Sequence, residues 1–424
     1  MLLIHGMDSH YFVFDRNIFK TKLTSLLTYF VIIPFVYPKG FSEYFLVYKN
    51  LFITWLYFAV FAVFILFISN VRNIKYKKSH CIIICYFLYM FIDTFVIRYS
   101  FENALQKIFA SPALYIFCCI LISKNAYLFI KSLANILIVL FFLNFFIFNP
   151  FFFDNYFDPD RLHLLFIGHV QVASQLGLIG VFIGYLLLYR HNVRKASKLI
   201  VLSIVTMIMS KTIASLFVIS CLLVGFTYIS ISKRHYLLQL NPIIYLVLTT
   251  FINVIFLILT YVVGYKFSFL GEPTTFNGRT TIWRNALELV SQELIFGYGA
   301  AGVKIQVYWS MLTKDSLGMY YAHNELIQEL LNGGIILLAL FCFVIFFHIV
   351  YLKNVKSKKL FYFSNLSFFI FSFIMIFESP TEYQYIYIFL AMLAYLPEIE
   401  NSFTTYLLDY FKLNYSSFLD KKFK

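Results

Sequence analysis

Long apolar stretches alternate with short polar gaps along almost the whole chain. A membrane-spanning helix needs about 20 mostly apolar residues, and this length predicts about twelve spans. They fall at 20–37, 50–69, 80–99, 110–123, 126–149, 170–189, 197–210, 212–231, 242–263, 325–351, 360–378 and 382–397. The pattern therefore predicts an all-α, polytopic bundle of transmembrane helices, with residues 1–424 forming a single integral membrane domain.

The composition supports a lipid environment. Of the 424 residues, 61% are hydrophobic and 13% are charged, whereas soluble domains have about 45–50% apolar and about 25% charged residues. A soluble fold of this length would be unable to bury so much apolar surface. The cysteines all lie in apolar stretches, without the spacing of a zinc site or a disulfide framework. We interpret them as small core residues, and we expect neither a metal nor another cofactor.

The basic residues predict how the chain crosses the membrane. Lys and Arg gather in the gaps near 72–78, 190–198, 233–234 and 353–359, and in the tail at 421–424. Basic loops stay on the cytoplasmic side, so with about twelve spans both termini are expected there. The net charge of +14 then reflects membrane orientation rather than binding of nucleic acid. Two longer segments are left outside, 150–169 and one large outer loop at 264–324.

Few other ionisable residues remain, and they lie outside or near the outer ends of spans. They are Asp93, Arg98, Arg161, His169, Lys211, Arg279, Arg284, His323, Glu325 and Glu378. Charged groups at membrane depth are costly, so they usually face a polar cavity. A group of cations suits an anionic substrate, and the arginine fork suits phosphate. Ion pairing between helices, for example Asp93 with Arg98, is the open alternative.

The large outer loop contains a turn, a helix and a glycine-rich segment. The turn at Gly278 precedes an amphipathic stretch that Thr280 or Thr281 would cap. Arg279 would then lie at a helix N-terminus, which favours anions, although an exposed loop arginine is the alternative. The GxGxxG pattern at 297–302 follows a helix rather than a buried strand. It therefore predicts a turn that folds the loop back and not a nucleotide site.

A polar stripe leads from the loop into the next apolar span. Helical spacing puts Glu325, Gln328, Glu329 and Asn332 on one face and the leucines and isoleucine of 326–331 on the other. The polar face should point into the bundle. His323 lies at its mouth, where a histidine can transfer a proton or bind phosphate, and a purely structural histidine is the alternative. The outer face shows no pair of carboxylates.

Three of these segments resemble the signature loop of the O-antigen ligase and polymerase superfamily, the Wzy and WaaL type. They are Gly278-Arg279-x-x-x-Trp283, Phe296-Gly297-x-Gly299 and His323-Asn324-x-x-x-Gln328-x-x-x-x-Gly333-Gly334. The segment from Arg161 to His169 is similar to the earlier arginine-containing outer segment of this family. Ser210-Lys211-Thr212 is similar to its Ser-Arg-Thr element, with a lysine that is less suited to bidentate phosphate binding.

The resemblance implies a glycosyltransferase on the outer face of the bacterial cytoplasmic (inner) membrane. The donor would be a glycan on undecaprenyl diphosphate, and cations would stabilise the departing diphosphate without a metal. Arg161 and Arg279 would clamp the diphosphate, and His323 would orient the donor or move the acceptor proton. The substrate-binding residues would be Lys211, Arg284, His169, Asn324 and Glu325. Lipid-linked glycans, membrane lipid and a chain-length regulator are the expected partners.

The resemblance leaves polymerase and ligase open. A polymerase adds the chain to the next lipid-linked repeat unit, and a ligase adds it to the lipid A core. The Phe- and Ile-rich composition, typical of AT-rich polysaccharide gene clusters, favours an O-antigen or surface polysaccharide polymerase. A flippase of the same glycan lipids is the alternative from another class, but the sequence shows neither paired halves nor glycine-broken helices. A non-enzymatic scaffold would not need Arg279 or His323.

Overall fold

The computed structural model describes residues 23–71, 77–97, 104–147, 164–231, 237–263, 279–307, 317–319 and 321–403. The first apolar helix is Leu23–Phe35. The α-helices that follow are α2 (Lys39–Tyr44), α3 (Leu46–Asn70), α4 (Lys78–Phe91), α5 (Ser111–Ile147), α7 (Val172–Tyr189), α8 (Val193–Met209), α9 (Ile213–Ile231), α10 (Pro242–Val263), α11 (Arg279–Gln292), α12 (Glu325–Ile349), α13 (Lys358–Phe377) and α14 (Ile386–Ala394).

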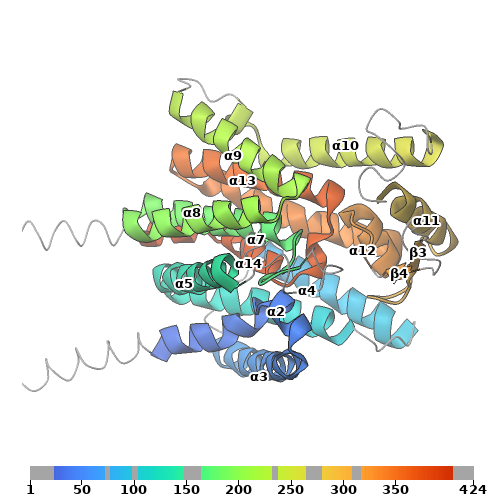
Figure 1. Cartoon of the computed structure of the whole chain (residues 1–424), viewed down its shortest axis with the longest axis horizontal. Coiled ribbons are helices and arrows are strands. Elements are labelled where there is room, and N and C mark those ends of the chain that lie inside the picture. Colours follow the sequence, from blue (N-terminus) through green and yellow to red (C-terminus); the bar gives the residue numbers. More distant parts are fainter. Residues whose placement is uncertain are drawn as a thin grey trace, which may run out of the picture.

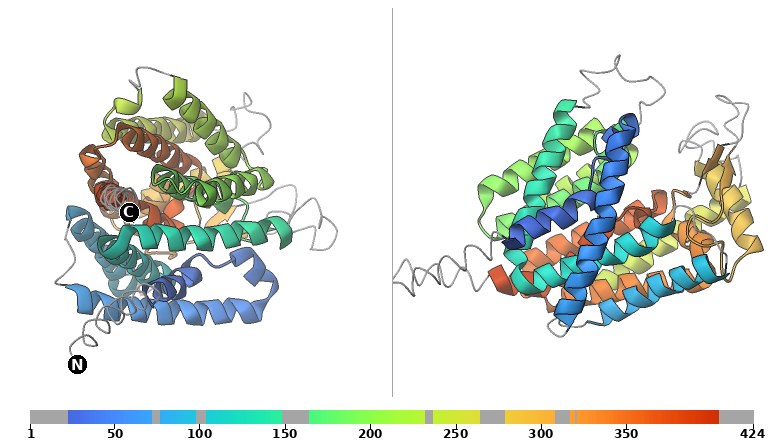
Figure 2. Two further views of the ribbon diagram at one scale, coloured as in Figure 1. Left: turned by 90° about the vertical axis from the view of Figure 1, so that its left-hand side faces the viewer. Right: turned by 90° about the horizontal axis from the view of Figure 1, so that it is seen from below.

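Short 3-10 and π-helical turns and two small hairpins complete the described secondary structure. The turns are η1 (Ile33–Phe35), η3 (Ile92–Ile97), η4 (Gln106–Ala110), η6 (Leu237–Gln239), η9 (Val350–Asn354) and η10 (Pro380–Glu382). The hairpins pair β1 (Leu164–Leu165) with β2 (Gly168–His169), and β3 (Ile305–Val307) with β4 (Leu317–Met319). Figures 1 and 2 show the long helices packed side by side, with α11, β3 and β4 at one end of the bundle.

Within the described residues, eight helices are long and apolar enough to cross a membrane. The predicted helical membrane fold is therefore confirmed. These helices differ in burial: the most apolar window is 83% buried in α7 and 78% in α13, but only 17% in α3 and 22% in α9. The outer helices leave large apolar side chains such as Phe58 and Val224 exposed, which suits lipid rather than water.

Helices α7 and α8 form a tight antiparallel pair. A Cβ atom added at Gly177 would lie 2.5 Å from the Met207 side chain, and one at Gly184 would lie 2.5 Å from that of Ile200. Small residues let helix backbones approach closely in membranes. This register places the turn at Lys211, which joins α8 to α9, level with the start of α7.

Helix α13 also runs antiparallel to α7. The ring of Phe363, near the start of α13, stacks on Tyr185 at 3.8 Å and on Phe182 at 5.9 Å between centroids, near the end of α7. The other end of α13, followed by Glu378, therefore lies level with the start of α7. Segments that are far apart in the sequence thus meet at one end of the bundle (Figure 1).

Helix α12 is broken by two glycines. Gly333 has φ −165° and ψ 23°, and Gly334 has φ 65° and ψ −161°. The expectation that no span is broken by glycine is therefore wrong. The φ/ψ values of Gly334 lie in a region that essentially only glycine occupies, so the pair of glycines determines where the helix breaks.

The segment 294–298 fills the break in α12. The backbone N–H of Tyr298 donates to the carbonyl of Leu331 at 2.8 Å, and the N–H of Ile335 donates to the carbonyl of Leu294 at 2.9 Å. Backbone groups freed at membrane depth must find partners inside the protein. A Cβ at Gly297 would lie 2.6 Å from the nitrogen of Gly334. The glycine-rich segment is thus a turn that folds back onto the bundle, as predicted.

Candidate substrate site at one end of the bundle

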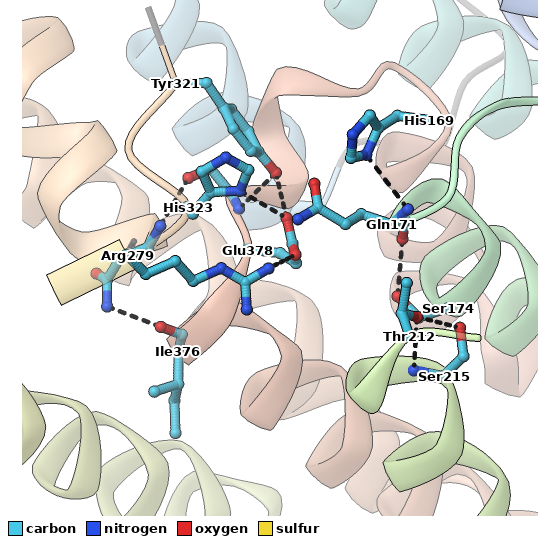
Figure 3. Close-up of polar contacts among 12 residues, drawn as sticks. His169, Gln171, Ser174, Thr212, Ser215, Arg279, Tyr321, His323, Ile376 and Glu378 are labelled. Carbon is cyan, nitrogen blue, oxygen red and sulfur yellow. Dashed lines mark hydrogen bonds and ion pairs between the residues drawn. The ribbon is translucent and has the colours of Figure 1, made fainter. Parts of the chain in front are cut away.

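A single buried carboxylate joins three segments of the site. Oε1 of Glu378 accepts a hydrogen bond from Nη2 of Arg279 at 2.5 Å. Its Oε2 accepts one from the hydroxyl of Tyr321 at 2.7 Å and lies 3.3 Å from Nδ1 of His323. Figure 3 shows the three side chains converging on Glu378. Because Glu378 has no exposed surface, these contacts take the place of water around its charge.

The phenol of Tyr321 remains a hydrogen-bond donor in this setting. Burial is the main cause that raises the pKa of Tyr321 well above its usual value, and the negative charge of Glu378 raises it further. The same oxygen of Tyr321 accepts the backbone N–H of Ser379 at 3.1 Å. The neutral phenol of Tyr321 therefore orients the Glu378 carboxylate by donating a hydrogen bond to it.

Helix α11 explains the spacing of the Gly-Arg-x-x-x-Trp motif. Arg279 begins the helix, so Thr280 and Thr281 lie in its first turn rather than capping it. Arg279 and Trp283 are four residues apart and therefore share a helical face. While Arg279 contacts Glu378, the buried indole Nε1 of Trp283 donates to the backbone carbonyl of His323 at 3.3 Å. One face of α11 thus holds both parts of the site.

The backbone of His323 is held in an unusual conformation. Its φ is 51°, in the left-handed region that non-glycine residues seldom adopt. The next residue, Asn324, caps α12 by accepting the N–H of Ile327 at 3.2 Å. Its amide also donates to Asn253 at 2.6 Å and to the carbonyl of Ile376 at 2.9 Å. These contacts make Asn324 a support that fixes the direction of the histidine.

The polar face of α12 points into the bundle, as predicted. Glu325, Gln328, Glu329 and Asn332 are each at most 2% exposed. Contrary to the expectation, two of them form a carboxylate pair: the hydroxyl of Thr381 lies 2.6 Å from Glu325 and 3.0 Å from Glu329. Their spacing of four residues already places them on one helical face. Among the described residues, no group of three or more His, Cys, Asp or Glu suits a metal ion.

The turn between α13 and α14 connects many elements of the site. Besides Glu378 and Thr381, it contributes Glu382, whose Oε1 contacts Nζ of Lys107 at 2.5 Å. It also contributes Tyr385, whose hydroxyl donates to Gln175 of α7 at 3.4 Å. Of this turn, the sequence pattern identified only Glu378, because a short polar turn carries no periodic signal.

His169 and Lys211 lie at the same end of the bundle. His169, on β2, has its Nδ1 3.5 Å from the backbone N–H of Gln171. Lys211 is exposed and, like His323, adopts a positive φ of 51°. In Figure 3 the side chain of Gln171 points from this side of the view toward Glu378. His169 and Lys211, two of the predicted site residues, thus lie at the end of the bundle where Glu378 lies.

Arg284 is not brought to the cluster. Its side chain is 54% exposed and pairs with Glu288 on the same helix, with 3.5 Å between Nε and Oε1. The pair lies within one helix, so it differs from the pairing between helices that was the alternative for these residues. Arg161 and Arg98 lie outside the described residues. Their predicted roles therefore stay predictions.

Fold and site together define a multi-pass helical membrane protein with a polar, charged cluster at one end of its bundle. Residues 164–342 match the family described as O-antigen ligase. The chain therefore carries an O-antigen ligase family domain, the domain that ligases and polymerases share, and the resemblance noted above is confirmed. The family is typical of the bacterial inner membrane, and its glycosyltransferase-like members act on lipid-linked glycans. No curated protein matches the chain.

Proposed function

We propose that this protein polymerises undecaprenyl-diphosphate-linked repeat units into O-antigen or another surface polysaccharide. The observation that carries this proposal is the convergence of Arg279 and His323 on Glu378. A cation for a phosphate leaving group and a histidine for a hydroxyl proton are what glycosyl transfer from a lipid diphosphate requires. The Phe- and Ile-rich composition favours the polymerase over the ligase.

We further propose about twelve spans, with both termini in the cytoplasm and residues 264–324 as the large outer loop of a single membrane domain. Asn125, with φ −158° and ψ 84°, divides α5 at the gap expected between 110–123 and 126–149. Three of the expected spans coincide with apolar helices that are shorter than a full crossing. These helices are Leu23–Phe35, α8 and α14. These coincidences support the proposal.

In the proposed reaction, an acceptor hydroxyl attacks the anomeric carbon of the donor sugar. The bond between that carbon and the diphosphate oxygen breaks, and its electron pair leaves with the undecaprenyl diphosphate. The hydroxyl proton passes to Nε2 of His323, while Glu378 at Nδ1 orients the ring and stabilises the imidazolium. The hydrogen bond between Trp283 and the carbonyl of His323 supports this assignment because it fixes the base.

Arg279 would bind the departing diphosphate with the guanidinium N–H groups that do not contact Glu378. Its side chain is 14% exposed, so it is pre-oriented yet accessible. Arg161 would be the second clamp on the diphosphate, Lys211 would assist, and His169 and Glu325 would border the substrate. We propose that the transfer is metal-independent because these cations supply the stabilising charge. Arg284 is left out of the site because it is exposed and pairs with Glu288 on α11.

A flippase is the second candidate, and one observation favours it. Transporters often use discontinuous helices at their binding sites, and α12 is broken at Gly333. However, the break is filled by the loop around Tyr298, which satisfies the freed backbone groups. The transferase therefore remains the better candidate.

Separate substitutions Arg279→Ala and His323→Ala test the function, with Arg284→Ala as the matched control on the same helix. Surface polysaccharide is run on a gel after membrane expression is verified. Ladders that collapse to single exported repeats support the polymerase. Full-length polymer that stays on its lipid carrier indicates a ligase, and repeats trapped inside indicate a flippase. Ladders unchanged from those of the control would refute the site.

A further inference from the structure

We infer that Glu325 holds a proton at neutral pH and donates it in a hydrogen bond to Thr381, while Glu329 is ionised. The resulting chain of hydrogen bonds makes Glu325 and Glu329 positioning residues, because it joins the start of α12 to the turn between α13 and α14 that carries Glu378. The protonation of Glu325 is independent of the proposed function, on which only the transfer assay described below rests.

The two carboxyl groups lie where ionising both would be costly. Neither Glu325 nor Glu329 has any exposed surface, and neither forms an ion pair with a described residue. Lys107 interacts electrostatically with Glu329, but its Nζ already contacts Glu382 at 2.5 Å. When two buried carboxyl groups share one site, like-charge repulsion keeps a proton on one of them. The surroundings therefore favour one negative charge on this pair rather than two.

A count of the available hydrogens leads to the same result. The hydroxyl oxygen of Thr381 lies 2.6 Å from Oε1 of Glu325 and 3.0 Å from Oε1 of Glu329. A threonine hydroxyl has one hydrogen to donate, and an ionised carboxylate has none. Two ionised carboxylates would therefore compete for a single hydrogen at these short distances. A proton on one carboxyl group turns both contacts into hydrogen bonds.

The other contacts indicate which carboxyl group is protonated. The hydroxyl of Tyr86 lies 2.9 Å and 3.0 Å from the two oxygens of Glu329. Two oxygens that accept equally are expected of an ionised carboxylate, since a protonated one has a donor on one oxygen. At Glu325, Oε2 accepts the backbone N–H of Thr381 at 3.3 Å. The proton therefore lies on Oε1 of Glu325, which donates to Thr381, and Thr381 in turn donates to Glu329.

This chain of hydrogen bonds connects the two segments that supply the charged cluster. Glu325 follows His323 by two residues, and Thr381 follows Glu378 by three. A bond between Glu325 and Thr381 therefore limits how far the two segments can separate. Nδ1 of His323 lies 3.3 Å from Glu378, a contact that a small shift of either segment would break. The buried pair thus helps to hold the histidine against its carboxylate.

Infrared difference spectroscopy of the purified full chain at neutral pH tests the protonation of Glu325. A protonated carboxyl group has a carbonyl stretching band that an ionised carboxylate lacks. Glu325→Gln should remove one such band from the spectrum of the wild type, and Glu329→Gln should not. The control Glu288→Gln removes a carboxylate that is 55% exposed and should leave this spectral region unchanged. A spectrum of Glu325→Gln that keeps every carboxylic-acid band of the wild type would overturn the inference.

Thermal unfolding in detergent distinguishes the two carboxyl groups independently. Glutamine resembles a protonated glutamate in shape and in having both a donor and an acceptor. Glu325→Gln should therefore lower the melting temperature less than Glu329→Gln, in which an amide N–H₂ replaces one of the two oxygens that accept from Tyr86. The opposite order would contradict the placement of the proton on Glu325.

Transfer kinetics of Thr381→Val test the positioning role. Valine keeps the size of the side chain but removes the bridging hydroxyl. This variant should lower kcat about tenfold, the equivalent of one hydrogen bond, with little change in KM. A raised KM with normal kcat would contradict the positioning role. A wild-type chain that shows the band of Glu325 but transfers no glycan would instead contradict the proposed function and leave the protonation of Glu325 standing.

Discussion

Replacing Glu378 with glutamine would remove the charge on which Arg279, Tyr321 and His323 converge. The carboxylate has no exposed surface, and the Arg279 side chain is only 14% exposed. The glutamine keeps the size of the side chain and part of its hydrogen bonding. It leaves the largely buried guanidinium, however, without its counter-charge.

The magnitude follows from the burial of this pair. Removing one partner of a buried ion pair costs about 3–5 kcal/mol, and the amide oxygen that remains places Glu378→Gln at about 3 kcal/mol. The matched control is Glu288→Gln, which breaks the pair with Arg284, whose partners are 54% and 55% exposed. Exposed pairs of this spacing contribute about 0.3–0.5 kcal/mol.

Thermal unfolding of the purified chain in detergent would measure the difference, and the polysaccharide ladder would report the activity. Glu378→Gln should lower the melting temperature far more than Glu288→Gln and should abolish the ladder. A double-mutant cycle with Arg279→Gln isolates the pair, and the double variant should be less destabilised than the sum of the single variants. Additive effects, or a stability equal to that of the control, would refute a buried pair as the centre of the site.

Three further predictions follow from the same contacts. Gly334→Ala should prevent stable folding, because backbone strain alone costs about 1–3 kcal/mol and the new Cβ would lie 2.1 Å from the carbonyl oxygen of Ile295; size-exclusion chromatography of the extracted chain measures this. Trp283→Phe should keep the fold but reduce transfer, since it loses the hydrogen bond to His323, and a rate assay with lipid-linked repeats checks it. The raised pKa of Tyr321 implies stability that is complete below about pH 10 and lost as the pH rises further. Unfolding of the wild type should therefore depend more steeply on pH above about 10 than that of Tyr321→Phe.

Each of these predictions has a control in the chain. Gly177→Ala meets only the flexible side chain of Met207, so comparable damage there would contradict the backbone explanation for the broken helix. The indole nitrogen of Trp55 has no hydrogen-bond partner among the described residues. An equal loss of transfer in Trp55→Phe would thus contradict the role of the indole. Tyr57 is 49% exposed, and the same change of pH slope in Tyr57→Phe would argue against Tyr321.

Local patterns were enough to predict the helical membrane fold and part of the site. A span is visible as a run of apolar residues, because lipid solvates every side chain along it. The buried face of α12 was visible for a similar reason: Glu325 and Glu329 follow the helical period. Arg279 and His323 were candidates because ionisable residues near the membrane are rare.

The partners of these residues depend on the tertiary structure. Glu378 lies 55 residues after His323 and 99 after Arg279 in the chain, and no local period links positions so far apart. Likewise, α2 meets the distant hairpin of β1 and β2 only because Gly40 allows a close approach to Leu165, while Arg284, on the same helix as Arg279, pairs with Glu288 instead. Composition and periodicity determine which segments enter the membrane. The packing of the helices determines which charged groups meet, because the local sequence of either helix alone does not give the relative position of the two.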